Sequence, residues 1–289
     1  MSTGRAVSVA ILKGGVGKST IAVNITERLA ARGHDALFID LDPNGHASMG
    51  LGFDEAYRAD LDIGDVLLEE GDADPGEVIH ETEYGFDVLP SSNNLEVVED
   101  GLRNATMGDV RLRRFLVEPL LEDGTYDYIV TDSPAYRGKL ADNALIASGN
   151  MMLPLVPGNE ALAGFERTME RQISPLRNHI DLDILAIVPN RLSERIDQQN
   201  NDRRLVENLN TKEHLEQYTP NFARITDEEF ERIDSGDLRP LPKPGLRDRR
   251  AFTYAFGESQ PLAHYAPDND QLPHLDELAE IVEQGGVER

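Results

Sequence analysis

The chain has 289 residues, with 53 acidic against 28 basic side chains, a formal net charge of -25 and no cysteine. This length suits one large α/β domain, and the lack of cysteine excludes disulfides, iron-sulfur clusters and thiolate zinc sites. The acidic, lysine-poor composition argues against a broadly basic nucleic-acid footprint and favours a halophilic source, whose salty cytosol screens charge repulsion.

The first predicted elements are a strand and a helix joined by a glycine-rich loop. Residues 6–12 form a short apolar run rich in β-branched side chains, and residues 21–32 carry apolar side chains at helical spacing before Gly33. Between these two runs stands Lys13-Gly-Gly-Val-Gly-Lys-Ser-Thr20. A glycine-rich loop that follows a strand and opens a helix is the context that a phosphate-binding P-loop requires.

The loop has the groups needed to hold a magnesium-bound nucleotide. Its glycines let backbone N–H groups turn toward phosphates, and the start of the helix adds positive potential. Lys18 can reach the β- and γ-phosphates, Ser19 can coordinate Mg²⁺ and Thr20 can add a hydroxyl contact. We therefore expect ATP and Mg²⁺ as cofactors, bound by the loop residues Gly14, Gly15, Val16, Gly17, Lys18, Ser19 and Thr20.

Further buried strands are predicted along the chain, each followed by turn residues or a helix-like stretch, at residues 36–41, 86–89, 128–131, 151–156 and 184–188. Strands that alternate with helices indicate βαβ units. The predicted fold class is therefore α/β, a mostly parallel, twisted central sheet with helices on both faces. Ligands of such sheets bind at the carboxyl ends of the strands. We expect a single domain over residues 1–289, with surface excursions near 54–83 and 193–244.

The last predicted element is an amphipathic helix over residues 272–284, with an apolar stripe and acidic residues on its other face. A helix that lies on a membrane surface would carry lysine or arginine there, so we expect this helix to dock on the sheet. No window of the chain approaches the ~18 apolar residues of a membrane span. We therefore expect the protein in the cytoplasm.

The glycine-rich loop departs from the ordinary P-loop pattern G-x-x-x-x-G-K-[ST], because Leu12 replaces the first glycine and Lys13 follows it. In the form K-G-G-x-G-K-[ST] it resembles the deviant Walker A loop of the ParA/MinD (Soj-like) family of P-loop ATPases. The resemblance implies that the early lysine, here Lys13, reaches across a dimer to the ATP of the partner subunit.

A second segment, residues 38–48, resembles the family's switch I, whose usual wording is D-x-D-P-Q-G-N-A-[ST]. Asp40 and Asp42 match this pattern, whereas Asn44 and His46 replace the usual glutamine and asparagine. The resemblance implies that Asp42 positions the attacking water. His46 is either a solvated loop histidine or a switch contact that replaces the amide.

Later segments resemble the rest of the family's nucleotide site. Residues 126–134 are similar to the Walker B strand and switch II, in which Asp132 matches the carboxylate that holds a magnesium-bound water. Residues 187–191 end in Asn190-Arg191, where the family often uses the asparagine to read adenine. Two more segments resemble the family's late adenine-side loop and closing strand, residues 250–252 and 257–265.

The resemblance implies a ParA-like ATPase whose ATP-bound dimer and ADP-bound monomer present different surfaces, so that hydrolysis times DNA partition or cargo positioning. Its implied partners are a second copy of the chain and a ParB-like or cargo adaptor protein that stimulates hydrolysis. MinD-like members use a basic tail on membranes, and the acidic tail here implies no membrane partner. The implied catalytic residues are Lys13, Lys18 and Asp42, and the implied magnesium ligands are Ser19, Asp40 and Asp132.

Non-specific DNA is a further expected partner, which would place the protein on the nucleoid. Two arginine clusters could contact DNA phosphates, one at residues 247, 249 and 250 and the other at residues 111, 113 and 114. The alternative is that the late arginines pair with local acids or flank the adenine. The sequence leaves both interpretations open.

Two other functions remain open at this point. A metabolic P-loop ligase of the dethiobiotin synthetase kind shares the loop style and fold, but it would need a dedicated pocket for a small substrate. A scaffold that binds ATP without hydrolysing it is the second alternative, because His46 departs from the switch I pattern.

Overall fold

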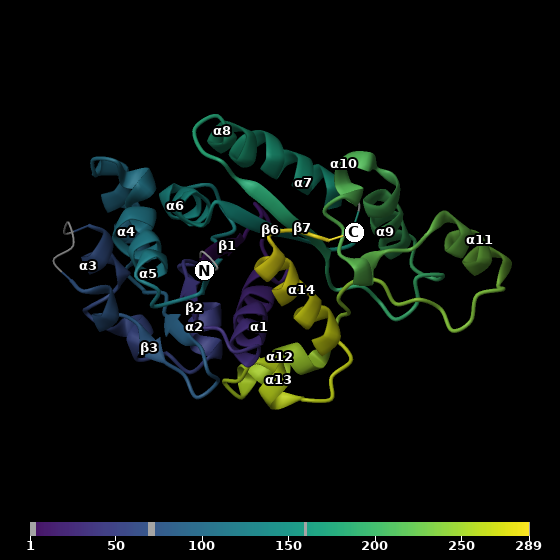
Figure 1. Cartoon of the computed structure of the whole chain (residues 1–289), viewed down its shortest axis with the longest axis horizontal. Helices are drawn as coiled ribbons and strands as arrows, with labels where there is room; N and C mark the ends of the chain where they lie inside the picture. Colours follow the sequence, from purple (N-terminus) through teal and green to yellow (C-terminus); the bar gives the residue numbers. More distant parts are fainter. Residues whose placement is uncertain (1–3, 69–72, 159–160, 289) are drawn as a thin grey trace.

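The computed structural model describes residues 4–68, 73–158 and 161–288, and within them a seven-stranded sheet has the order β3-β4-β2-β5-β1-β6-β7 (Figure 1). β3 is antiparallel to β4, and the other neighbouring strands are parallel. This confirms the predicted α/β class. The strands are β1 (Arg5–Val9), β2 (Ala36–Asp40), β3 (His80–Glu81), β4 (Asp87–Leu89), β5 (Tyr128–Asp132), β6 (Asn150–Leu155) and β7 (Asp183–Pro189).

Helices cover both faces of the sheet (Figure 1). They are α1 (Lys18–Ala31), α2 (His46–Gly50), α3 (Ile63–Leu67), α4 (Leu95–Asn104), α5 (Glu118–Glu122), α6 (Lys139–Ser148), α7 (Ala161–Thr168), α8 (Ser174–Arg177), α9 (Asn200–Thr211), α10 (Glu213–Glu216), α11 (Asp227–Ser235), α12 (Arg250–Gly257), α13 (Leu262–Tyr265) and α14 (Leu272–Gln284).

The central strands are buried on both sides, which is why they read as continuous apolar runs. In β2, Phe38 packs into the core layer beneath α1 and α14, while its neighbours Leu37 and Ile39 pack into the layer beneath α4 and α6. This alternation follows from the two-residue period of a strand. The parallel strands bring their carboxyl ends to one edge of the sheet, where the predicted site residues lie.

The carboxyl-terminal helix docks as expected. α14 lies beside α1, and its apolar stripe is buried in the same core layer (Figure 1). The side chain of Arg5 donates a hydrogen bond of 2.7 Å to the carbonyl oxygen of Glu283, and Arg32, which directly follows α1, pairs with the Glu283 carboxylate. Both ends of the described chain are therefore fastened to each other.

One predicted element is wrong. The segment expected to hold a late loop and a closing strand instead forms α12 and α13. In α12, Ala251 and Ala255 are four residues apart, as are Phe252 and Phe256, so the apolar side chains share one helical face. This four-residue spacing is visible in the sequence and favours a helix. The short, exposed strand β3 was not predicted.

The two expected excursions contain short helices. Residues 54–83 hold α3, β3 and a 3-10 turn at Ala56–Arg58, and residues 69–72 of this excursion lie outside the described residues. Residues 193–244 hold α9, α10 and α11. Apolar side chains of α9 and α11 form a small separate core, whereas Leu215 of α10 packs into the core beside β6 and β7. The single domain over residues 1–289 stays a prediction. None of the helices described is both long enough and apolar enough to cross a bilayer.

Candidate nucleotide-binding site

A hollow of about 420 Å³ lies at the carboxyl edge of the sheet. It brings together the glycine-rich loop, switch I, the end of β7 and the start of α12, segments that are far apart in the sequence. Its lining residues are Gly14, Gly15, Gly17, Lys18, Ser19, Thr20, Ile21, Asp42, Asn44, His46, Ala135, Asn190, Arg191, Leu246, Arg247, Asp248, Arg249, Phe252, Thr253 and Phe256.

The loop backbone needs glycine at two positions. Gly15 and Gly17 have φ of 72° and 89°, in the left-handed region that disfavours other residues. A Cβ atom on Gly17 would also lie 2.4 Å from the side-chain amide nitrogen of Asn190. The residue before α1, Gly17, has no side-chain cap, so the first N–H groups of this helix are left for another acceptor. An uncapped helix start of this kind favours a phosphate.

Lys18 and Ser19 begin α1 and line the hollow together. Lys18 is only 6% exposed, so its ammonium group is held in a largely desolvated position at the loop. Burial raises the pKa of the nearby Asp132 carboxyl, and the positive charge of Lys18 offsets part of that rise. The loop therefore combines a cation, a hydroxyl and free backbone donors at one place.

Asp40 and Asp132 end β2 and β5 and face each other in the parallel register. Both are completely buried, and burial is the main cause that raises the pKa of each, that of Asp40 to about 6. Asp40 accepts hydrogen bonds of 3.0 and 2.7 Å from the backbone N–H and the hydroxyl of Ser48. Neither carboxylate oxygen of Asp132 has a hydrogen bond of normal geometry, although the Ser19 hydroxyl is near enough to lower its pKa.

These oxygens suit a magnesium ion. Mg²⁺ prefers oxygen ligands and keeps several waters, so it needs few protein ligands. Among the described residues no group of three or more acidic, histidine or cysteine side chains could enclose a metal by itself. The set Ser19, Asp40 and Asp132 therefore fits an ion that is bound mainly by phosphates and water, with the unpaired Asp132 oxygens free to accept from that water.

Asp42 lies at the mouth of the hollow, in the switch I loop. Its Oδ1 accepts hydrogen bonds from the backbone N–H of Asn44 at 3.0 Å and from the Asn44 side-chain amide at 2.8 Å. The asparagine that replaces the usual glutamine thus holds one carboxylate oxygen. His46 lines the same hollow and is exposed.

Lys13 and Val16 do not line the hollow, although they belong to the loop. Val16 is buried, with its side chain in the core. The Lys13 side chain lies against α7 instead, where its Cδ is 4.0 Å from the position of a Cβ on Gly164. The ammonium group of Lys13 therefore does not belong to the pocket of its own subunit.

Asn190 joins the end of β7 to the loop. Its side-chain nitrogen donates a 2.8 Å hydrogen bond to the carbonyl oxygen of Val16, and its Oδ1 accepts from the backbone N–H of Arg191. The expected contact of Asn190 with adenine stays a prediction. The observed hydrogen bond to Val16 connects the end of β7 to the glycine-rich loop.

Several residues of the site were not expected from the sequence. Ser48 fixes Asp40, and its hydroxyl also accepts a 2.8 Å hydrogen bond from the backbone N–H of Ser91. Phe256 on α12 also lines the hollow, beside Phe252 of the segment 250–252, which was expected on the adenine side. The helical spacing of the two aromatic residues was the signal that could have placed them on one face.

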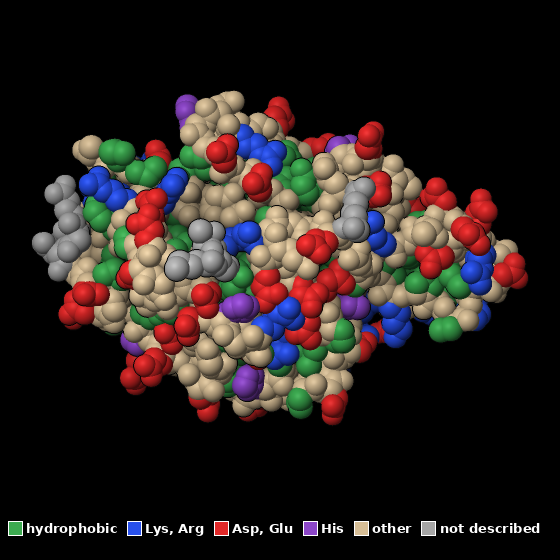
Figure 2. Space-filling view, viewed as in Figure 1, with side chains coloured by type: hydrophobic (Ala, Val, Ile, Leu, Met, Phe, Trp, Pro, Cys, Tyr) green, Lys and Arg blue, Asp and Glu red, His purple; other side chains and the backbone are tan. Residues whose placement is uncertain are grey.

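Two arginines of the late cluster, Arg247 and Arg249, contact local groups. Arg247 is 1% exposed and donates to the carbonyl oxygen of Ser193, and Arg249 pairs with Glu194 and Asp270. The acidic side chains are spread over the face seen in Figure 2, with lysine and arginine side chains among them. The contacts of Arg249 favour the interpretation in which it pairs with local acids, and both Arg247 and Arg249 line the hollow.

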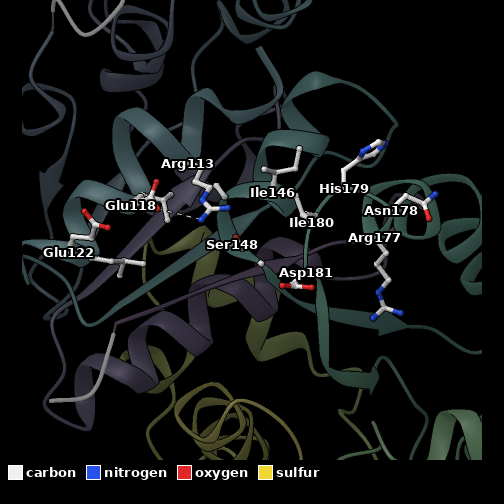
Figure 3. A pocket seen from close by; sticks show the side chains of 14 residues that line it. Arg113, Glu118, Glu122, Ile146, Ser148, Arg177, Asn178, His179, Ile180 and Asp181 are labelled. Carbon is white, nitrogen blue, oxygen red and sulfur yellow. Dashed lines mark hydrogen bonds and ion pairs between the residues drawn. The ribbon is translucent and has the colours of Figure 1, made fainter. Parts of the chain in front are cut away.

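The earlier arginine cluster is also engaged. Arg111 is buried and donates to the carbonyl oxygen of Leu67 at 2.7 Å, and Arg114 lies over the ring of Phe115. Arg113 pairs with Glu118 at the rim of a second hollow, of about 740 Å³, at the opposite edge of the sheet (Figure 3). The labelled side chains of that hollow have mixed charge and point in different directions, so it offers no matched set of groups for one ligand.

Comparison with known proteins places the chain in a family. A family model described as an AAA domain matches residues 4–184. The sporulation initiation inhibitor protein Soj of Bacillus subtilis is 34% identical over 185 residues, which cover 63% of this chain and 70% of Soj. The chromosome partitioning protein ParA of Caulobacter vibrioides is 34% identical over 200 residues, which cover 66% of this chain and 73% of that protein. An uncharacterised Pseudomonas putida protein is 37% identical over 158 residues, or 54% of this chain, and the match spans only 58% of its length.

Solved structures share the fold over most of the chain. The ATP complex of Cyanothece McdA has a TM-score of 0.72 at 18% identity, covering 100% of this chain and 99% of McdA. Cobyrinic acid a,c-diamide synthase from Mycobacterium smegmatis, with bound ADP and magnesium, has a TM-score of 0.65 at 25% identity, covering 88% and 91% of the two chains. At 18% identity, the similarity to McdA is evidence for a shared fold only.

Proposed function

The chain belongs to the AAA-domain family of its relatives Soj and ParA, and we propose that it is a ParA-like ATPase that dimerises on binding Mg-ATP. The observation that carries this proposal is the placement of the two loop lysines. Lys18 lines the hollow of its own subunit, whereas Lys13 is turned out of it toward α7. A phosphate-binding loop whose second lysine does not reach the hollow of its own subunit is suited to control by dimerisation.

We assign the phosphate-binding role to the loop and the start of α1. The N–H groups of residues 14–20 receive the phosphates, and Lys18 neutralises charge on the β- and γ-phosphates. Ser19, Asp40 and Asp132 hold Mg²⁺ directly or through water, and bound Mg²⁺ neutralises charge that develops on the phosphates. Phe252 and Phe256 supply an apolar wall beside the nucleotide.

Asp42 is proposed to orient the attacking water. It lies at the mouth of the hollow, and Asn44 occupies only its Oδ1. The other oxygen is therefore available to accept a hydrogen bond from water. Orientation of a nucleophile and stabilisation of phosphate charge are the main contributions that proteins make to phosphoryl transfer.

Lys13 is proposed to act in the partner's site. A cation that arrives only in the dimer stabilises the transition state after two nucleotide-bound subunits have met, so hydrolysis follows assembly and limits its lifetime. We infer that the limited lifetime of the ATP-bound dimer serves DNA partition or the positioning of a cargo. The proposed stimulating partner is a ParB-like or cargo adaptor protein, and the proposed location is the cytoplasm.

The experiment that tests this proposal is a measurement of molecular mass in solution with ADP and with ATP, in buffer of high KCl concentration. We expect a monomer with ADP and a dimer with ATP, and a longer-lived dimer for Asp42→Ala, which cannot turn over. A protein that stays monomeric with ATP at micromolar concentration would contradict the proposal, and ATP-induced dimers without hydrolysis would support the scaffold alternative.

A metabolic ligase is the second candidate, because the synthase from Mycobacterium smegmatis has a similar fold at 25% identity. A ligase couples ATP cleavage to a second substrate, so it should hydrolyse ATP slowly until that substrate is added. Saturable ATP hydrolysis without any added small molecule would favour the ParA-like function.

A further inference from the structure

A tyrosine outside the nucleotide-binding motifs contacts the switch I loop. Tyr57 lies in the 3-10 turn Ala56–Arg58, within the excursion near residues 54–83. Its hydroxyl donates a 2.9 Å hydrogen bond to the carbonyl oxygen of Pro43. Its ring lies against Gly45, where a Cβ atom would come within 2.5 Å of ring carbon Cε2. One side chain thus contacts two residues of the loop that carries Asp42.

Gly45 is adapted to this contact. It has φ of 59° and is buried, and it immediately precedes α2. Glycine is required there both by the left-handed backbone and by the ring that occupies the place of a side chain. On the following turn, a Cβ on Gly50 would lie 2.9 Å from the ring of Phe256, so a second aromatic ring packs on the same short segment.

Tyr57 is itself held in place. Its backbone N–H donates to the carbonyl oxygen of Phe53 at 2.9 Å, and its carbonyl oxygen accepts from the backbone N–H of Asn93 at 3.0 Å. The loop that contains Asn93 also contacts switch I directly, because the Ser91 hydroxyl donates to the carbonyl oxygen of Asp42 at 2.7 Å. The carbonyl groups of Asp42 and Pro43 are therefore both fixed by side chains from outside switch I.

From this geometry we propose that Tyr57 is a positioning residue for hydrolysis, which holds switch I so that the Asp42 carboxylate faces the hollow. The inference rests on the proposed ATPase function. Tyr57 does not line the hollow, so its proposed role is to position other groups. Its contribution is to restrict a loop whose glycine would otherwise allow many backbone conformations, since a displacement of about 1 Å at a catalytic group can cost about 100-fold in rate.

The predicted effects separate the ring from the hydroxyl. Tyr57→Ala removes both and is expected to lower kcat by about 10- to 100-fold, with KM changed by less than about threefold. Tyr57→Phe keeps the ring on Gly45 and loses one hydrogen bond, so kcat should fall by only about two- to tenfold. Titration with ADP gives the concentration of sites that bind nucleotide. Dividing each rate by this concentration gives a kcat that refers to folded protein only.

Tyr126→Phe is the matched control. The Tyr126 hydroxyl donates a 2.7 Å hydrogen bond to Asp87, but it lies at the amino end of β5, at the edge of the sheet opposite the hollow. Loss of this hydrogen bond should change the unfolding free energy and leave kcat at the wild-type value.

A double-mutant cycle tests the contact itself. Gly45→Ala places a methyl group against the Tyr57 ring, and in the Tyr57→Ala background that space is empty. The loss in kcat caused by Gly45→Ala should therefore be at least about threefold smaller in the Tyr57→Ala background than in the wild type.

The outcomes distinguish this inference from the proposed function. A wild type that binds ATP without hydrolysing it would remove the proposed function, and the inference with it. Active wild type together with Tyr57→Ala at the wild-type kcat, or with raised KM and unchanged kcat, would overturn the role of Tyr57 alone. Equal losses from Gly45→Ala in both backgrounds would also overturn it.

Discussion

Asp40 and Asp132 are register partners on the neighbouring parallel strands β2 and β5, and both side chains are completely buried. Ser48 satisfies Asp40 with two hydrogen bonds, whereas both oxygens of Asp132 lack a partner. A buried carboxylate without a partner is destabilising, so its presence indicates a ligand that restores the loss. We propose that Mg²⁺ and its waters bind there.

The first prediction concerns Asp132→Asn in metal-free protein. Burial raises the native pKa of Asp132 above the unfolded value of about 4, so the native state keeps a proton that the unfolded chain has released. Stability from this group therefore falls as pH rises above about 4. Asparagine does not ionise, so the variant does not lose stability in this way. Its free energy of unfolding should be about 1–3 kcal/mol higher than that of the wild type at pH of about 8.

Denaturant unfolding in EDTA across about pH 4.5 to 8 measures this difference. The advantage of Asp132→Asn should shrink as pH falls toward the unfolded pKa. Adding Mg-ADP should stabilise the wild type more than the variant, which keeps the loop but loses one of the proposed magnesium-site carboxylates. A variant that is less stable than wild type throughout this pH range would show that Asp132 has a structural partner.

The second prediction separates water activation from nucleotide binding. Asp42→Ala should bind ATP with an affinity within about threefold of wild type and lose at least about 100-fold in kcat, because Asp42 orients water and does not hold phosphate. Lys18→Ala should lose nucleotide binding, because Lys18 is the lysine of the glycine-rich loop that lines the hollow. Fluorescent-nucleotide titration and single-turnover hydrolysis measure the two effects. Wild-type turnover by Asp42→Ala would remove the proposed role of this carboxylate.

Features of the fold and site that depend on local sequence patterns were predicted correctly. The strand–loop–helix around Lys18 and the aspartates at the ends of β2 and β5 followed from apolar runs, glycines and motif spacing. The contact of Tyr57 with Gly45 could not be predicted, because it joins residues whose proximity depends on the path of an irregular excursion. The hydrogen bond from Asn190 to Val16 spans 174 positions and likewise depends on the assembled sheet.

The environment of the late arginines could not be predicted from the sequence. Their clustering in the sequence suggested a surface for DNA, but clustering does not reveal burial or pairing. Arg247 is enclosed, and Arg249 lies between Glu194 and Asp270. The acidic residues that pair with Arg249 are 55 and 21 positions away from it, so the sequence did not show that its charge was already compensated.

The third prediction tests this pairing. The Arg249 hydrogen bonds lower the pKa of Asp270 to about 2, so this carboxylate adds stability above its unfolded pKa of about 4 and loses it as pH falls toward 2. Because Asp270 is about half exposed, Arg249→Ala should cost only about 0.5–1 kcal/mol at neutral pH. The cost should decrease as pH falls below about 4.

Unfolding experiments at several pH values measure this cost, and DNA co-sedimentation of the ATP-trapped Asp42→Ala protein supplies the second readout. Arg249→Ala in the Asp42→Ala background should retain as much DNA as Asp42→Ala alone, whatever that amount is. Loss of DNA retention together with unchanged stability would assign Arg249 to the DNA surface and reject the structural role.

The most direct test of the central claim, that Lys13 completes the site of the partner subunit, is to mix two inactive variants. Lys13→Ala and Asp42→Ala should each bind ATP and lose turnover. In a mixed dimer one site has its own Asp42 and receives Lys13 from the partner, while the other site lacks both. Random pairing in an equimolar mixture should therefore restore about a quarter of the wild-type ATPase rate. A mixture that stays as inactive as its two components, although both variants bind ATP and dimerise, would contradict the action of Lys13 across the dimer.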